Sequence, residues 1–416
     1  MDFPARGSAN CTPPDSERQW EQGCLEQVNE SCVVALGSSS NTFVDASTGN
    51  EGHGPGKLSV RVDGTKIVQI VNHWSSKASF KDCVSRSAEV LFPIKFQSME
   101  QKINFFALQA LCNFGRGYAK AIEQISQRSF DETQIFGFIS MHISSGVKWD
   151  ARFMRDIDLA TLADNFGLPL ETEEQAFSGV YVSKPSIFKD YFLLIQSVLR
   201  KVADDLVATG HHDFASFLLS AFEREKASTH GILKKLVDRV VDLSSVFHDE
   251  HELRQTTTDQ EDTGTPFGDK VKFYTNAQRL VRSVILNVNG PWSDEATFME
   301  EMNCFSGLAD STLIGVLRRL GIIQVQDPRI IDVIQNEEEI SGKNPEILMR
   351  CAAVVAIDEI VLSLKRERSI VCSAWQIDML LRDLLSDYKE ELVPQVAVDE
   401  NKTPVILHKS RNSIFF

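Results

Sequence analysis

Hydrophobic residues recur at helical spacing through most of the chain, and the clearest case is the segment CFSGLADSTLIGVLRRL, residues 304–320. Four apolar residues there follow the i, i+3, i+4, i+7 spacing of a half-buried helix: Leu313, Val316, Leu317 and Leu320. Asp310 comes just before this series, where a carboxylate caps a helix N-terminus. Asp310 is therefore either a plain helix cap or a reactive group held on a rigid element.

Similar apolar stripes predict helices along the rest of the chain. The predicted helices cover residues 99–114, 157–166, 188–207, 213–222, 231–241, 271–287, 328–334, 346–364 and 372–388. The segment 346–364 is apolar on nearly every side, which indicates a central, buried position. The sequence contains neither a Gly-rich phosphate loop nor a βαβ alternation. We therefore expect a mostly α protein.

Two segments allow more than one interpretation. In SVRVDGTKIVQIVNHW, Asp63-Gly64 is typical of a hairpin turn. Alternatively, Asp63 caps a helix whose apolar stripe is complete, and we favour this helix; the stripe is Ile67, Ile70, Val71 and Trp74. Residues 134–143 are apolar and fit either a helix or a buried strand, and the sequence does not separate these two structures.

The composition along the chain predicts one folded domain with an extension. Residues 1–57 are rich in Ser, Gly, Asn, Thr and Pro, so we expect a disordered N-terminal extension. Residues 58–416 then form a single large helical domain. Within it, residues 252–268 are polar and predict an exposed loop inserted into the domain. The terminal Ile414, Phe415 and Phe416 are expected to pack onto the body rather than lie free in solvent.

The net charge of −15 argues against a partner with a phosphate backbone. Tight binding to nucleic acid depends on cationic side chains that displace counterions, so we expect no stable nucleic-acid partner, although a local basic pocket is compatible with this charge. None of the 8 cysteines forms a CxxC pair, no secretion signal precedes them, and no apolar run approaches the ~20 residues that span a bilayer. These features predict a cytoplasmic protein that does not enter a membrane.

The segment LADSTLIGVLRRLG resembles the acidic motif of the queuosine salvage family. Other segments resemble the family in the same order, over roughly residues 60–416: INFFALQALCNFGRGY, FGFISMHISSG, GVYVSKP, KFYTNAQRLV, RCAAVVAIDEI, WQIDMLLRDLL and the terminal HKSRNSIFF. Their collinear order carries the resemblance. It implies a fold like that of helical glycosylases and an N-glycosylase that releases the base queuine from queuosine 5′-phosphate.

The resemblance also implies roles for five residues. Asp310 takes the place of the catalytic carboxylate, which stabilises positive charge at the sugar C1′ or adds to it covalently. Asp378 and Asp383 are placed at the base pocket, where carboxylates suit the N–H donors of a 7-deazaguanine and the ammonium of its arm. Met379 stands where the family carries a Tyr, and Leu308 where it carries an aromatic residue near the base.

Several features keep other interpretations open. Asp378 and Asp383 are five residues apart, about 140° around a helix, so both cannot point the same way. Thr275, Ile314 and Leu348 also depart from the family pattern. A helical binding protein without turnover therefore remains the alternative, while the acidic charge disfavours a nucleic-acid glycosylase.

We expect no cofactor and no metal. The stretch HDEH, residues 248–251, offers only a weak zinc-like spacing. The expected partner is a small nucleoside or nucleotide substrate, and the expected oligomeric state is a monomer.

Overall fold

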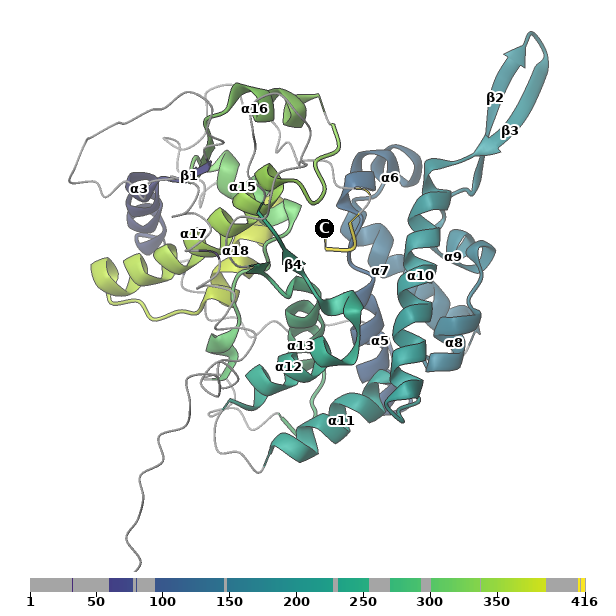
Figure 1. Cartoon of the computed structure of the whole chain (residues 1–416), viewed down its shortest axis with the longest axis horizontal. Helices are drawn as coiled ribbons and strands as arrows, with labels where there is room; N and C mark the ends of the chain where they lie inside the picture. Colours follow the sequence, from purple (N-terminus) through teal and green to yellow (C-terminus); the bar gives the residue numbers. More distant parts are fainter. Residues whose placement is uncertain are drawn as a thin grey trace, which may run out of the picture.

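The computed structural model describes residues 60–77, 94–145, 148–226, 231–253, 270–292, 301–336 and 338–386, together with positions 32, 80, 411 and 413–415. Over these residues the chain is mostly helical, which confirms the predicted fold class (Figure 1). The first half contains β1 (Val60–Val62), α3 (Gly64–Ser75), α5 (Met99–Leu111), η1 (Arg116–Tyr118), α6 (Ala119–Ser126), α7 (Phe130–Ser145), α8 (Ala151–Asp156), α9 (Leu159–Phe166), β2 (Glu171–Phe177), β3 (Val180–Pro185) and α10 (Ile187–Ala208).

The second half contains most of the elements that surround the candidate site. They are α11 (Phe214–Glu225), α12 (Ile232–Leu243), η2 (Ser245–Phe247), β4 (Glu250–His251), β5 (Val271–Lys272), α13 (Thr275–Asn287), η3 (Met302–Cys304), α15 (Ser311–Arg319), β6 (Ile323–Val325), α16 (Pro328–Gln335), α17 (Asn344–Arg368) and α18 (Ala374–Ser386). None of the described helices is both long enough and apolar enough to span a bilayer.

Helix α17 is the central element of one side of the molecule. Most of its residues between Asn344 and Ile360 are buried, as expected for a segment that is apolar on nearly every side. It packs against α3, α15, α18 and the strand β1. The predicted central position of this helix is confirmed.

Helix α13 joins this side to the rest of the molecule. It packs against α5 and α12, which belong to the group of helices drawn in blue and teal (Figure 1). In the same view, α15, α17 and α18 lie on the other side, and the C-terminal residues lie between the two groups. Two arginines of α13 bridge the groups, because Arg279 binds Asp310 at the start of α15 and Arg282 binds Asp378 on α18.

Asp63 caps a helix, as we favoured from the sequence. Its carboxylate accepts hydrogen bonds from the backbone N–H groups of Thr65 and Lys66 at 2.9 and 3.1 Å. The hairpin interpretation is wrong, because β1 pairs antiparallel with β6, so that Val60 lies opposite Val325. Residues 134–143, for which the sequence allowed a helix or a buried strand, are helical and belong to α7. Gly137 fits there because an added Cβ would lie 2.6 Å from the Phe166 ring.

Two features differ from the sequence predictions. The strands β2 and β3 form a fully exposed hairpin that projects from the body (Figure 1). Its residues share no buried face, so the hydrophobic pattern gave no signal for it. The helix predicted over residues 271–287 begins only at Thr275, because Val271 and Lys272 pair with β4 and Tyr274 has a φ of 49°.

Parts of two predictions lie outside the described residues. These are the loop at 252–268, apart from Glu252 and Leu253, and the N-terminal extension at 1–57, apart from Cys32. Cys32 is completely buried and belongs to the hydrophobic core. This position of the extension therefore packs into the core of the domain.

Candidate active site

Asp310 is both a helix cap and the centre of a buried ionic cluster. One carboxylate oxygen, Oδ1, accepts the backbone N–H of Leu313 at 3.1 Å, so the predicted N-cap of α15 is confirmed. The residue is completely buried. Its carboxylate is held in one orientation by the helix that it caps.

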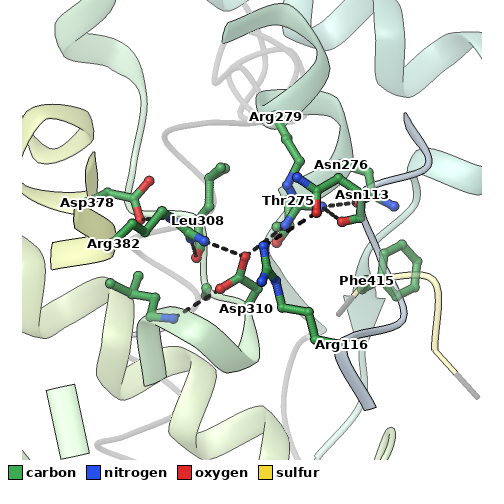
Figure 2. Close-up of polar contacts among 12 residues, drawn as sticks. Asn113, Arg116, Thr275, Asn276, Arg279, Leu308, Asp310, Asp378, Arg382 and Phe415 are labelled. Atoms are coloured by element: carbon green, nitrogen blue, oxygen red, sulfur yellow. Dashed lines mark hydrogen bonds and ion pairs between the residues drawn. The ribbon is translucent and has the colours of Figure 1, made fainter. Parts of the chain in front are cut away.

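Two arginines hold the other oxygen of the Asp310 carboxylate. Oδ2 accepts from Nη2 of Arg279 at 3.0 Å and from Nη1 of Arg382 at 2.8 Å. Arg279 comes from α13 and Arg382 from α18, so the cluster exists only because these helices meet at the start of α15. Figure 2 shows the three side chains converging.

Arg382 also contacts the second candidate carboxylate, Asp378, one turn earlier on α18. Nε of Arg382 donates to Oδ1 of Asp378 at 2.9 Å, and Nη2 donates to the carbonyl of Leu308 at 2.9 Å. The other oxygen of Asp378 accepts from Nη1 of Arg282 at 2.7 Å. Two carboxylates and three guanidiniums therefore form one alternating chain.

A further ion pair lies beside this chain. Arg116 binds Asp131 through two hydrogen bonds, of 3.1 and 2.7 Å, and its guanidinium lies 5.0 Å from the centre of the Phe130 ring. Nη1 of Arg279 donates to the carbonyl of Asn113 at 2.9 Å, which links Arg279 to the loop that carries Arg116. This region is thus locally basic within an acidic protein.

The electrostatics keep Asp310 ionised. Burial alone would raise the pKa of its carboxyl, but the guanidiniums of Arg382, Arg116 and Arg279 outweigh burial and hold the pKa well below its usual range. Burial lowers the pKa of Arg279 to about 10, and the neighbouring guanidinium of Arg382 acts in the same direction against the attraction of Asp310. Arg279 is still charged at neutral pH, so the pair stays ionic.

A second buried ion pair supports the loop that carries Asp310. Arg350 on α17 and Asp249 are both fully buried and make two hydrogen bonds, one of them 2.7 Å long. Nε of Arg350 donates to the carbonyl of Ala309 at 2.9 Å, and its guanidinium lies 3.8 Å from the centre of the Phe273 ring. Arg350 therefore fixes the backbone immediately before Asp310.

The C-terminal residues reach the same region. The carbonyl of Ile414 accepts from Nδ2 of Asn276 at 2.9 Å, and Oδ1 of Asn276 accepts from Arg279 at 2.9 Å. The Phe415 ring packs edge-on against His251, with ring centres 5.9 Å apart. The prediction that the terminal apolar residues pack onto the body is confirmed for Ile414 and Phe415.

The structure brings some of the predicted site residues together. Asp310, Leu308 and Asp378 meet through Arg382, as described above. Leu308 and Asp378 are buried, whereas Met379 and Asp383 are half-buried on other sides of α18. The roles of all five residues in ligand binding and catalysis stay predictions.

The residues that depart from the family pattern occupy structural positions. The Thr275 hydroxyl accepts from Nη2 of Arg350 at 2.8 Å, and the Thr275 N–H donates to Asp249 at 3.2 Å. Ile314 and Leu348 are buried in the hydrophobic core.

Sequence reasoning missed the cations of this site. Arg279, Arg282 and Arg350 lie on helices whose apolar pattern predicts only burial, and their carboxylate partners are 31, 96 and 101 residues away. One signal was available locally, because Arg382 follows Asp378 by four residues and such pairs meet on one helix face. In HDEH, His251 and Asp249 contact Arg350, and no group of three metal-ligating side chains was found among the described residues.

The arrangement limits the chemistry that Asp310 can perform. An ionised carboxylate fixed on a helix terminus can stabilise a developing positive charge or attack an electrophilic carbon. It cannot donate a proton, because its pKa is held low by three arginines. The site therefore suits a reaction that passes through a cationic centre beside Asp310.

Comparison with known proteins identifies the family of this helical protein. The sequence model of a family described as queuosine salvage protein matches residues 195–416, more than half of the chain. The chain therefore belongs to the queuosine salvage protein family, which confirms the resemblance. The similar motifs before residue 195 lie outside that match. No curated protein matches the chain significantly.

Proposed function

We propose that the protein is an N-glycosylase that hydrolyses queuosine 5′-phosphate, or queuosine, and releases queuine for tRNA modification. Family membership supports a role in queuosine salvage. The observation that carries the specific reaction is the buried, ionised carboxylate of Asp310 on the N-terminus of α15. Among the described residues, no other buried carboxylate lies both in a motif that resembles the family and at the N-terminus of a helix.

The reaction breaks the bond between the base nitrogen and C1′ of the ribose. As this bond lengthens, positive charge develops at C1′, and the Asp310 carboxylate stabilises it or bonds to C1′ until water adds. Water supplies the hydroxyl that ends on C1′, and a proton ends on the base. Asp310 is assigned the cation-stabilising role and not the proton transfer, since it is held ionised.

Asp378 is assigned to recognition of the base or its cationic arm. Its carboxylate is completely buried and shares the guanidinium of Arg382 with Asp310, so both carboxylates belong to one site. Leu308 is assigned to cover a ring face of the base, although it cannot stack like an aromatic side chain. Met379 and Asp383 complete the proposed pocket from the half-buried sides of α18.

A second candidate function is favoured by one observation. All four oxygens of Asp310 and Asp378 already accept hydrogen bonds from protein groups. A protein that binds queuine or its nucleotide without turnover would be compatible with carboxylates neutralised in this way. The two functions differ in product formation and not in binding.

One experiment separates the two functions. Purified protein is incubated with queuosine and with its 5′-phosphate, and free queuine is followed by mass spectrometry, with Asp310→Asn as the matched control. Release by the native protein and not by the variant supports the glycosylase. Binding of either compound without release, in both proteins, would establish the binding protein.

A further inference from the structure

Arg382 uses every nitrogen of its guanidinium on the candidate site. Nε binds Asp378, Nη1 binds Asp310 and Nη2 binds the carbonyl of Leu308, at distances between 2.8 and 2.9 Å. Because two of these partners are charged, the contacts belong to the stronger class of hydrogen bonds. The side chain thus occupies the space between the two carboxylates.

Arg382 is also the most exposed member of this cluster. Its side chain is 21% exposed, compared with 1% for Asp310 and 0% for Asp378. The side chains of Arg279 and Arg282 are 8% and 10% exposed. Arg382 is therefore the member of the cluster that solvent reaches most, and it contacts both buried acids.

We infer that Arg382 is a positioning residue that acts as an internal counter-ion, which a substrate has to displace from Asp310 before the sugar can approach that carboxylate. The inference rests on the proposed function of Asp310. The guanidinium lies 2.8 Å from Oδ2 of Asp310 and is the most exposed group on that carboxylate, so it holds a place where positive charge would develop at C1′. Coulomb repulsion between these two cations makes simultaneous occupancy unfavourable.

The contacts also indicate how Arg382 can move. Nε is bonded to Asp378 on the same helix, four residues away, so this contact can persist while the two terminal nitrogens leave Asp310 and Leu308. Arg279 stays on Oδ2 and the N–H of Leu313 stays on Oδ1, so Asp310 keeps its orientation. Displacement therefore frees one hydrogen-bonding position on Oδ2 of Asp310, and the N-cap of α15 stays intact.

The charge surrounding Asp310 sets the effect of this displacement on ionisation. Arg382 from α18, Arg279 from α13 and Arg116 from η1 all favour the ionised carboxylate, whereas Asp131 from α7 opposes it. Without Arg382, two cations still face Asp310. The pKa of Asp310 should then rise, because one of the cations that lower it is gone.

The kinetic test compares Arg382→Met with Arg282→Met. Both variants remove one cation that contacts Asp378, but only the first also uncovers Asp310. Removing a charge-assisted contact that the substrate must break should raise kcat/KM for queuosine 5′-phosphate about tenfold to a hundredfold. The increase in kcat/KM should come from a lower KM, because Arg382 is displaced when the substrate binds. The acid limb of the pH profile should move to higher pH.

Arg382→Lys keeps a cation next to Asp310 but cannot make all three contacts, so its kcat/KM should lie between those of the native protein and of Arg382→Met. An Arg382→Met protein that melts normally but shows unchanged KM and an unchanged acid limb would overturn the inference. So would an equal gain in kcat/KM for Arg282→Met, because the effect would then belong to the charge of the cluster and not to the cover over Asp310.

A second measurement does not require turnover. Carbodiimide with an amine nucleophile labels accessible carboxyl groups in the folded native protein and its variants, and peptide mass spectrometry locates the label. Labelling of Asp310 should be near zero in the native protein and in Arg282→Met. In Arg382→Met it should increase about tenfold for each unit by which the pKa rises, with exposed Glu173 as the internal reference.

The two measurements separate the possible failures. If no variant releases queuine but Arg382→Met exposes Asp310 to label, the proposed glycosylase function fails while Arg382 still covers the acid. If queuine is released and Asp310 remains unlabelled in folded Arg382→Met, the counter-ion inference fails while the proposed function stands.

Discussion

Arg350 and Asp249 form an ion pair in which both side chains are completely shielded from solvent. Removing either partner leaves the other charge buried and unpaired, which costs roughly 3–5 kcal/mol. Asp249→Ala should therefore lower the free energy of unfolding by about that amount, as measured by denaturant titration. The double variant Asp249→Ala with Arg350→Met should recover part of the loss. If the double variant instead loses the sum of the two single-variant losses in unfolding free energy, the two charges do not stabilise each other.

Asp310→Asn should abolish queuine release while the protein stays folded. The amide keeps an oxygen that can cap α15, but it loses the charge that stabilises a cationic C1′, a change typically worth 10²–10³ in turnover or more. Melting temperature and turnover are measured together. Asp327→Asn is the matched control, since Asp327 also caps a helix, α16, but lies outside the candidate site. Native turnover in Asp310→Asn would remove Asp310 from the mechanism.

Asp378→Ala should weaken the binding of queuine on the order of tenfold to a hundredfold, the effect of losing one charge-assisted hydrogen bond. Calorimetry with queuine and with 7-deazaguanine tests which part of the ligand Asp378 meets. Loss confined to queuine would place Asp378 at the cationic arm, and equal loss would place it at the base edge. Asp383→Ala on the same helix provides the comparison, and unchanged affinity for both ligands in Asp378→Ala would refute the assignment.

Asp358 should make stability fall as pH rises. Burial, assisted by the neighbouring Glu359, raises the pKa of this carboxyl from 3.8 to about 7. Between these values the folded protein holds a proton that the unfolded chain has released, so stability decreases with increasing pH over that window. Asp358→Asn should therefore gain melting temperature relative to the native protein from about pH 4 to pH 7. A constant difference across this range would contradict the assignment.

Much of the helical architecture was predictable, because apolar spacing reports directly on burial. The helices α5, α10 and α17 were expected from their stripes, and Asp310 was expected as a cap from its place before Leu313. The pattern is local, however. It contains no information on which distant segment a short strand such as β1 will pair with, and none on a hairpin whose residues are all exposed.

The candidate site was predictable only for its acids. The resemblance to the family pointed to Asp310 and Asp378. Arg279, Arg350 and Arg382 also lie in segments that resemble the family, but the resemblance gave them no role as counter-ions. Arg279 and Arg350 are buried by partners contributed from distant elements, so their sequence surroundings do not reveal a charge partner. The spacing of four residues indicates the contact of Arg382 with Asp378, but it does not indicate the contact of Arg382 with Asp310.

The pairing of β1 with β6 has a consequence for how the chain can be divided. The segment that matches the family, residues 195–416, contains β6, α13 and α17, but these elements pack on β1, α5 and α3 from the first half. The start of the family match, residue 195, therefore does not coincide with a boundary of the packed core. A fragment that starts at residue 195 would expose the apolar faces of α13 and α17 and should aggregate, because closing the core requires contacts between segments more than 200 residues apart.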